Sequence, residues 1–91
     1  MTIDYKKLEE NLPKLTGNDF IECENAVSNG GVLLVDARYN SAFQARLAAT
    51  ALEVPYPEIA ALPVKEFKKV TAAVFAFLFA QDSETPTPSE V

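Results

Sequence analysis

One stretch in the C-terminal half decides the fold, and it reads Val64-Lys65-Glu66-Phe67-Lys68-Lys69-Val70-Thr71-Ala72-Ala73-Val74-Phe75-Ala76-Phe77-Leu78-Phe79-Ala80. Positions 64, 67, 70, 71, 74, 77 and 78 follow the spacing of three and four residues that is typical of a helix with one buried face. At about 100° per residue they span an arc of roughly 140°. The pattern predicts a long helix that supplies a large part of the core.

The same helix carries more apolar surface than one buried face requires. Phe75 and Phe79 lie outside the arc, on the flank that Lys68 marks as solvent-facing, and most of the remaining surface is alanine, including Ala72. A helix that is apolar most of the way round is usually covered by more than one neighbour. Two interpretations remain open: either both phenylalanines pack beneath residues 32–35, or Phe75, Phe79, Lys68 and Ala72 form a partner-binding surface.

Length and composition indicate one small globular domain over residues 1–80. The chain has 91 residues, of which 48% are hydrophobic and 23% are charged. The net charge of −5, without a sustained basic run, argues against nucleic acid as a partner. No histidine and only one cysteine, Cys23, occur, so we expect no catalytic site, no metal and no cofactor.

The sequence contains neither a signal peptide nor an apolar run long enough to span a membrane. The N-terminus is acidic and lacks the apolar core of a signal peptide. The longest apolar run, residues 70–80, has about half the length that a membrane-spanning helix needs. With a single cysteine that cannot form an internal disulfide, we expect an intracellular protein without membrane attachment.

The N-terminal third predicts two helices. Residues 4–12 carry Tyr5, Leu8 and Leu12 at helical spacing before Pro13. Thr16 and Asp19 then have the spacing of a capping box, and Leu15 and Phe20 have that of a hydrophobic staple. This second helix continues through Cys23 and Val27 to the glycines at 30 and 31, which favour a helix end. Glu22 and Glu24, two residues apart, point in different directions and are expected to be solvated.

The middle of the chain holds one ambiguous segment and one clear helix. Residues 32–35 are four consecutive aliphatics that fit a strand or the opening turn of a helix. Without a second strand candidate, we expect this segment to pack onto the core in extended or helical form. From about Asp36 the period is helical, with a stripe formed by Tyr39, Phe43, Leu47 and Ala51. The many alanines of this helix predict that it lies at the centre of the bundle. For Arg46 two interpretations remain open: it pairs with a carboxylate on a neighbouring helix, or it reaches along the surface to solvent.

Prolines divide the rest of the chain. Pro55 is expected to stop the preceding helix. Pro57 is expected at the first position of a single helical turn over residues 57–62, and Pro63 at the first position of the final helix. Residues 81–91 are acidic and proline-rich, which predicts a disordered tail. The fold class that follows is all-α, a compact bundle of three main helices with one or two short helices.

Three segments together resemble one family. Residues 15–24 are similar to the opening of small phage tail assembly chaperones, in which Leu-Thr is followed by aspartate and glutamate. Residues 45–55 resemble the alanine-rich helix that runs into a proline turn in those proteins. Residues 59–67 resemble the element that leads into their final helix, which ends in a Phe-Leu pair, here Phe77 and Leu78. The resemblance covers about residues 15–79.

The resemblance implies a small helical protein of a long-tailed phage or prophage that acts in the host cytoplasm. Members of the family coat the tape measure protein before the tail tube polymerises, and many are also made in a longer, frameshifted form. The implied partners are the tape measure protein, the tail tube protein and further copies of the chain in a homo-oligomer. A longer form would join after Ala80.

Two other functions remain as alternatives. One is a small virion structural or connector subunit, or a homo-oligomeric adaptor, which would be present in finished virions whereas a chaperone would be absent. The other is a DNA-binding regulator, against which the acidic balance argues. The sequence itself predicts a non-enzymatic binding protein.

Overall fold

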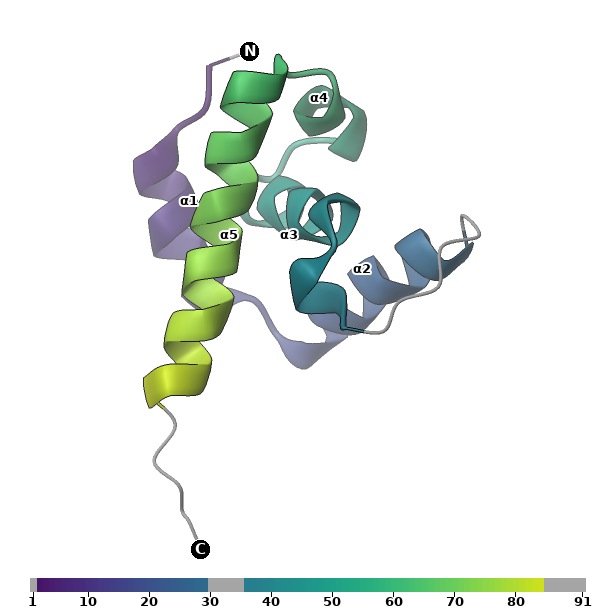
Figure 1. Cartoon of the computed structure of the whole chain (residues 1–91), viewed down its shortest axis with the longest axis vertical. Coiled ribbons are helices and arrows are strands. Elements are labelled where there is room, and N and C mark those ends of the chain that lie inside the picture. The colour runs from purple at the N-terminus through teal and green to yellow at the C-terminus, as the bar shows by residue number, and fades with distance from the viewer. Residues whose placement is uncertain (1, 30–35, 85–91) are drawn as a thin grey trace, which may run out of the picture.

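The computed structural model describes residues 2–29 and 36–84, with side chains described through residue 80. Within these residues every regular element is a helix (Figure 1). In chain order they are α1 (Tyr5–Asn11), the 3₁₀ helix η1 (Leu12–Lys14), α2 (Gly17–Asn29), the 3₁₀ helix η2 (Ala37–Tyr39), α3 (Ser41–Leu52), α4 (Tyr56–Ala60) and α5 (Val64–Glu84). This confirms the all-α fold, with α2, α3 and α5 as main helices and α1 and α4 as short ones.

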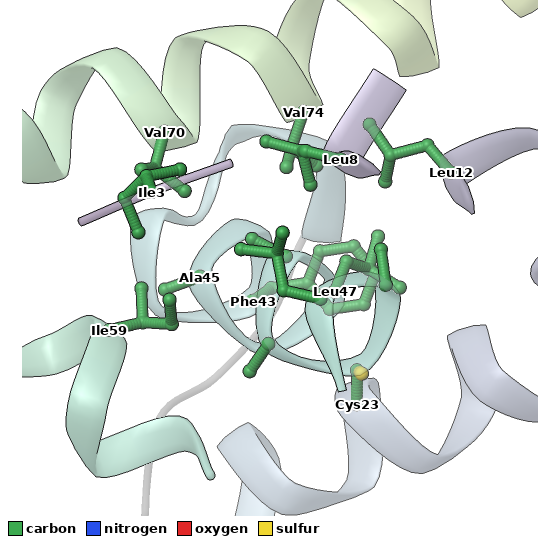
Figure 2. Close-up of a cluster of buried hydrophobic side chains, with 14 of the residues drawn as sticks. Ile3, Leu8, Leu12, Cys23, Phe43, Ala45, Leu47, Ile59, Val70 and Val74 are labelled. Carbon is green, nitrogen blue, oxygen red and sulfur yellow. The ribbon is translucent and has the colours of Figure 1, made fainter. Parts of the chain in front are cut away.

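Helix α3 lies at the centre, as its alanines predicted. It contacts α1, α2, α4 and α5, and Figure 2 shows side chains from these four helices around it. Four of its alanines are buried: Ala45, Ala48, Ala49 and Ala51. Small side chains allow neighbouring helices to approach closely, since the distance between helix axes depends on the residues at the contact. One short helix can therefore carry neighbours on several sides.

The core is built where these neighbours face α3. Its largest completely buried side chains are Phe43, Leu8, Ile59, Val70 and Val74, which come from four different helices (Figure 2). Burial of each such side chain contributes about 1.5–3 kcal/mol. The rings of Phe20 and Phe43 meet edge to face at 4.7 Å between centroids and join α2 to α3.

The buried arc predicted for α5 is correct in its middle and wrong at its start. Val70, Thr71 and Val74 are buried, and Phe67, Phe77 and Leu78 are partly buried. Val64, by contrast, is 74% exposed. Because α5 is longer than the helices it covers (Figure 1), its first residue extends past them.

The start of α2 forms the predicted capping box. The Asp19 N–H donates to Thr16 Oγ1 at 3.4 Å, and the Thr16 N–H donates to Asp19 Oδ2 at 2.9 Å. Both directions of the reciprocal bond are thus present. Cys23 and Val27 are buried, as their helical spacing predicted.

The third main helix starts later than the sequence pattern suggested. Asn40 caps α3, and its Oδ1 accepts the Phe43 N–H at 2.9 Å. Helix α3 therefore begins at Ser41, and Tyr39 belongs to η2 before it. The prediction that Tyr39 continues the buried stripe is wrong, because this residue is 65% exposed.

The proline-rich junctions differ from the prediction by one to three residues. Helix α3 ends at Leu52, ahead of Pro55, and Glu53 takes a left-handed conformation with φ of 61°. Pro55 precedes α4, so Pro57 is its second residue, and Pro63 precedes α5. The Pro63 carbonyl accepts the Phe67 N–H at 2.8 Å, which makes Pro63 the cap of α5.

Helix α5 is longer than predicted, since it continues to Glu84 instead of ending at Ala80. The interpretation of residues 32–35 and that of the glycines at 30 and 31 fall outside the described residues. The same holds for the predicted tail beyond residue 84.

Candidate functional site: the outer face of α5

The four residues predicted to bind a partner lie in one row on α5. Lys68, Ala72, Phe75 and Phe79 are separated by four, three and four residues, which places them on the same side of a helix. Lys65, Lys69 and Ala76 lie beside this row, and all of these residues are exposed except Phe79, which is half-buried. We call these seven residues the outer face, because they lie opposite the core residues Val70 and Val74.

An aromatic cluster formed by Tyr39, Phe75 and Phe79 occupies the C-terminal half of this face. The ring centroids of Phe75 and Phe79 are 4.4 Å apart, and Tyr39 lies 5.9 Å from Phe75 and 5.3 Å from Phe79. These separations are typical of favourable aromatic pairs. Tyr39 is 65% and Phe75 is 38% exposed, so the cluster is packed internally and still presents apolar area to solvent.

Arg38 covers one edge of the aromatic cluster. Its guanidinium carbon lies 4.6 Å from the centroid of Phe79. Asp36 fixes this orientation, since it accepts from Arg38 Nε at 3.1 Å and from Nη2 at 2.8 Å. These bonds hold the pKa of the Asp36 carboxyl below its ordinary value and raise the pKa of Arg38. The positive charge beside Phe79 is therefore already compensated by a carboxylate.

Two hydrogen bonds anchor η2, and with it Tyr39, to the central helix. Gln44, which is only 6% exposed, donates from Nε2 to the Arg38 carbonyl at 2.5 Å. Asn40 caps α3 directly after Tyr39. Asn40 Oδ1 accepts the Phe43 N–H, and both Phe43 and Gln44 lie on α3, so these bonds tie the residues on either side of Tyr39 to that helix.

At the other end of the face, three lysines are exposed without a carboxylate partner among the described residues. Lys65, Lys68 and Lys69 make no ion pair there. The nearby carboxylate, Glu66, instead accepts a hydrogen bond from the Tyr5 hydroxyl. Lys69 Nζ lies 5.8 Å from the centre of the Tyr5 ring. The N-terminal half of the outer face is therefore basic, and the C-terminal half is aromatic.

Comparisons with protein-family models, curated proteins and solved structures find no match to this chain. The resemblance to tail assembly chaperones thus stays a prediction.

A second feature is a hollow of about 320 Å³ between α2, α3 and α4, lined by Cys23, Arg46, Thr50 and Tyr56 among others. Burial raises the pKa of the Cys23 thiol, which therefore stays protonated at neutral pH and is a poor nucleophile. The Arg46 guanidinium lies 4.1 Å from the centroid of Tyr56. Arg46 thus reaches along the surface onto a ring, and no carboxylate among the described residues pairs with it.

Other sequence-based expectations concern residues away from the outer face. Glu22 is exposed and Glu24 is partly buried, and among the described residues no group of three acidic, cysteine or histidine side chains is placed to hold a metal ion. No described helix has the length and apolarity that a bilayer crossing requires.

The sequence pattern predicts the α5 part of this candidate site and does not predict the η2 part. The spacing of Tyr39 from Phe43 fits a helix and therefore predicts a core position for Tyr39. The pattern Asn40-Ser41-Ala42-Phe43 contains the information that corrects this, since asparagine is among the preferred N-capping residues and as a cap it makes the helix begin at Ser41, after Tyr39. The position of Arg38 depends on Gln44, which no local pattern indicates.

Proposed function

We propose that this protein is a non-enzymatic phage tail assembly chaperone that uses the outer face of α5 to bind a helical segment of the tape measure protein. The observation that carries the proposal is the partly exposed aromatic cluster of Tyr39, Phe75 and Phe79. Aromatic residues are enriched among the side chains that dominate binding energy at protein interfaces. The resemblance over residues 15–79 supplies the identity of the client.

The outer face has properties that suit a chaperone which covers the apolar stripe of a client helix. A long amphipathic helix exposes an apolar stripe that aggregates unless it is covered. An outer face that is already packed internally offers a rigid surface, so little side-chain entropy is lost on binding. The bonds from Gln44 to the Arg38 carbonyl and from the Phe43 N–H to Asn40 support this, because they tie the residues on either side of Tyr39 to α3.

Co-expression with the tape measure protein of the same phage or prophage genome tests the proposal. We expect the wild-type chain to keep the tape measure protein soluble and to co-purify with it. Phe75→Ser and Phe79→Ser should each reduce co-purification at least tenfold. The matched control is Ile21→Ser, which removes an exposed apolar side chain from α2, where Ile21 is 52% exposed. If the phenylalanine variants still co-purify normally, the outer face is not the binding surface.

A second measurement separates the chaperone from the alternative of a virion connector. A chaperone should be absent from purified finished particles, whereas a structural subunit should be present in stoichiometric amount. Quantitative mass spectrometry of purified particles gives the answer. Stoichiometric incorporation would contradict the chaperone function.

A further inference from the structure

The charge on the outer face differs from that of the whole chain. The chain carries 13 acidic and 8 basic residues, yet the exposed charged residues of α5 between positions 64 and 80 are all lysines. Glu66, the one acidic residue in this range, is partly buried and accepts the Tyr5 hydroxyl hydrogen bond. Charges of opposite sign across an interface set partner choice and orientation. The outer face therefore favours carboxylates, although the molecule as a whole repels them.

The lysines and the aromatic rings lie at opposite ends of the face. From Lys65 to Phe79 the helix rises about 21 Å, at 1.5 Å per residue. Lys65, Lys68 and Lys69 lie in the first two turns of α5, and Phe75 and Phe79 lie in its fourth and fifth turns. A ligand that fits this arrangement has a distinct acidic end and a distinct apolar end, about four helical turns in total.

Between the two ends, the surface is shaped for a helix. Ala72 lies between the lysines and the aromatic rings, Ala76 lies about one turn further along next to Phe75, and both are exposed. Small residues at a helix contact permit a short distance between helix axes. A ligand helix can thus lie along the alanines, with its side chains reaching the lysines at one end and the aromatic rings at the other.

From these features we infer that the occupant of the outer face is an amphipathic helix whose two ends differ in chemistry. One end carries carboxylates that lie over Lys65, Lys68 and Lys69. The other end carries apolar side chains that lie on Tyr39, Phe75 and Phe79. This inference deepens the proposed function, on which it rests for the identity of the site, by specifying the chemistry of the client segment.

Two other occupants fit these observations less well. A second copy of α5 has no exposed carboxylate between residues 64 and 80 to offer to the lysines. An anionic membrane would meet a molecule with a net charge of −5, whereas a single helix contacts only the basic face. Both are distinguishable in the experiment.

The test uses the full chain and two synthetic peptides of about 18 residues that share one leucine stripe. One peptide has four glutamates at one end, and the other has four lysines at the same positions. Fluorescence anisotropy of labelled peptides gives the dissociation constants at low salt. We expect the acidic peptide to bind about tenfold more tightly, which is the size expected for two or three exposed ion pairs. The preference should shrink as ionic strength rises.

A pair of charge-matched variants locates the effect. Lys65→Glu with Lys68→Glu should abolish or reverse the preference for the acidic peptide. Lys6→Glu with Lys14→Glu changes the net charge by the same amount at exposed positions on α1 and η1, and it should leave the preference unchanged. Equal binding of the two peptides, or an equal response of the two variants, would overturn the inference.

The remaining outcomes each decide one claim. Binding to phosphatidylserine vesicles without preference between the peptides would identify a membrane as the occupant and overturn the inference. Self-association that is lost on Phe75→Ser would identify a second copy and would overturn it too. If the tape measure protein binds but ignores Lys65→Glu with Lys68→Glu, the proposed function stands and the inference fails. If the acidic peptide binds with the expected preference but the tape measure protein does not, the inference stands and the proposed function fails.

Discussion

At the residue scale, the capping box of α2 shows unequal contributions from its two members. Asp19 Oδ2 accepts the Thr16 N–H at 2.9 Å, whereas Thr16 Oγ1 accepts the Asp19 N–H at 3.4 Å. The carboxylate also lies at the positive end of the helix dipole. The shorter, charge-assisted bond is the stronger of the two.

We therefore expect Thr16→Ala to lower the free energy of unfolding by about 1 kcal/mol and Asp19→Ala to lower it by at least as much. Urea unfolding followed by circular dichroism measures both. Asn18→Ala, at an exposed neighbouring position, is the control. If Thr16→Ala unfolds at the wild-type urea concentration, the box does not stabilise α2.

Because of the contact between Tyr5 and Glu66, we expect the free energy of unfolding to fall at alkaline pH. Partial burial, together with the hydrogen bond to the Glu66 carboxylate, raises the pKa of Tyr5 from 10.0 to about 12. A phenol with a raised pKa in the folded state binds its proton more tightly there than in the unfolded state. Its contribution is therefore complete below pH 10 and is lost as the pH rises through about 12.

Tyr5→Phe removes this contribution. We expect the free energy of unfolding of the wild type to fall more steeply between pH 10 and 12 than that of Tyr5→Phe. The two proteins differ only at residue 5, so the difference between the two curves isolates Tyr5. Parallel curves would mean that the phenol is not held by Glu66 in solution.

At the element scale, the end of α3 contains a strained residue. Glu53 has φ of 61°, and the N–H groups of Glu53 and Val54 donate to the carbonyls of Thr50 and Ala49. This is the Schellman arrangement, in which glycine is the usual left-handed residue because a Cβ costs energy there. Lys7 pairs with Glu53 at 3.5 Å, but both side chains are exposed enough that this pair contributes little.

Glu53→Gly should therefore be more stable than Glu53→Ala by about 1 kcal/mol, although glycine normally weakens a helix. Both variants lose the pair with Lys7, so their difference reports the left-handed conformation alone. Thermal unfolding of the two variants provides the comparison. A more stable alanine variant would show that the backbone at residue 53 is not left-handed in solution.

The elements also show what could be predicted from the sequence and what could not. The capping box at Thr16 and the long periodic pattern of residues 64–80 are local, and the helices they predict are present. The surface position of Tyr39 does not follow from helical periodicity, because it depends on the Asn40 cap and on the bond from Gln44 to the Arg38 carbonyl. Likewise, the packing of Tyr39 on Phe75 and Phe79 joins residues more than 30 positions apart, which no local pattern indicates.

At the scale of the whole molecule, the core and the outer face contain different phenylalanines. Phe43 is completely buried in α3, whereas Phe75 is 38% exposed on the outer face. We expect Phe43→Ala to lower the free energy of unfolding by about 3–5 kcal/mol. Phe75→Ser should lower it by less, about 1–2 kcal/mol, because 38% of Phe75 is already exposed and the substitution removes two ring contacts with partial burial. A loss of 3 kcal/mol or more for Phe75→Ser, measured by urea unfolding, would place Phe75 in the core.

The central position of α3 has a consequence for synthesis on the ribosome. The apolar side of α3 that α5 covers has no partner until α5 has been made. At about 5–20 residues per second, the chain from residue 53 to residue 84 takes about 2–6 s to synthesise. During this interval α1, α2 and α3 are present as a nascent chain with an uncovered apolar surface. Stalled nascent chains of increasing length should accordingly develop pulling force in one step, after α5 has left the exit tunnel.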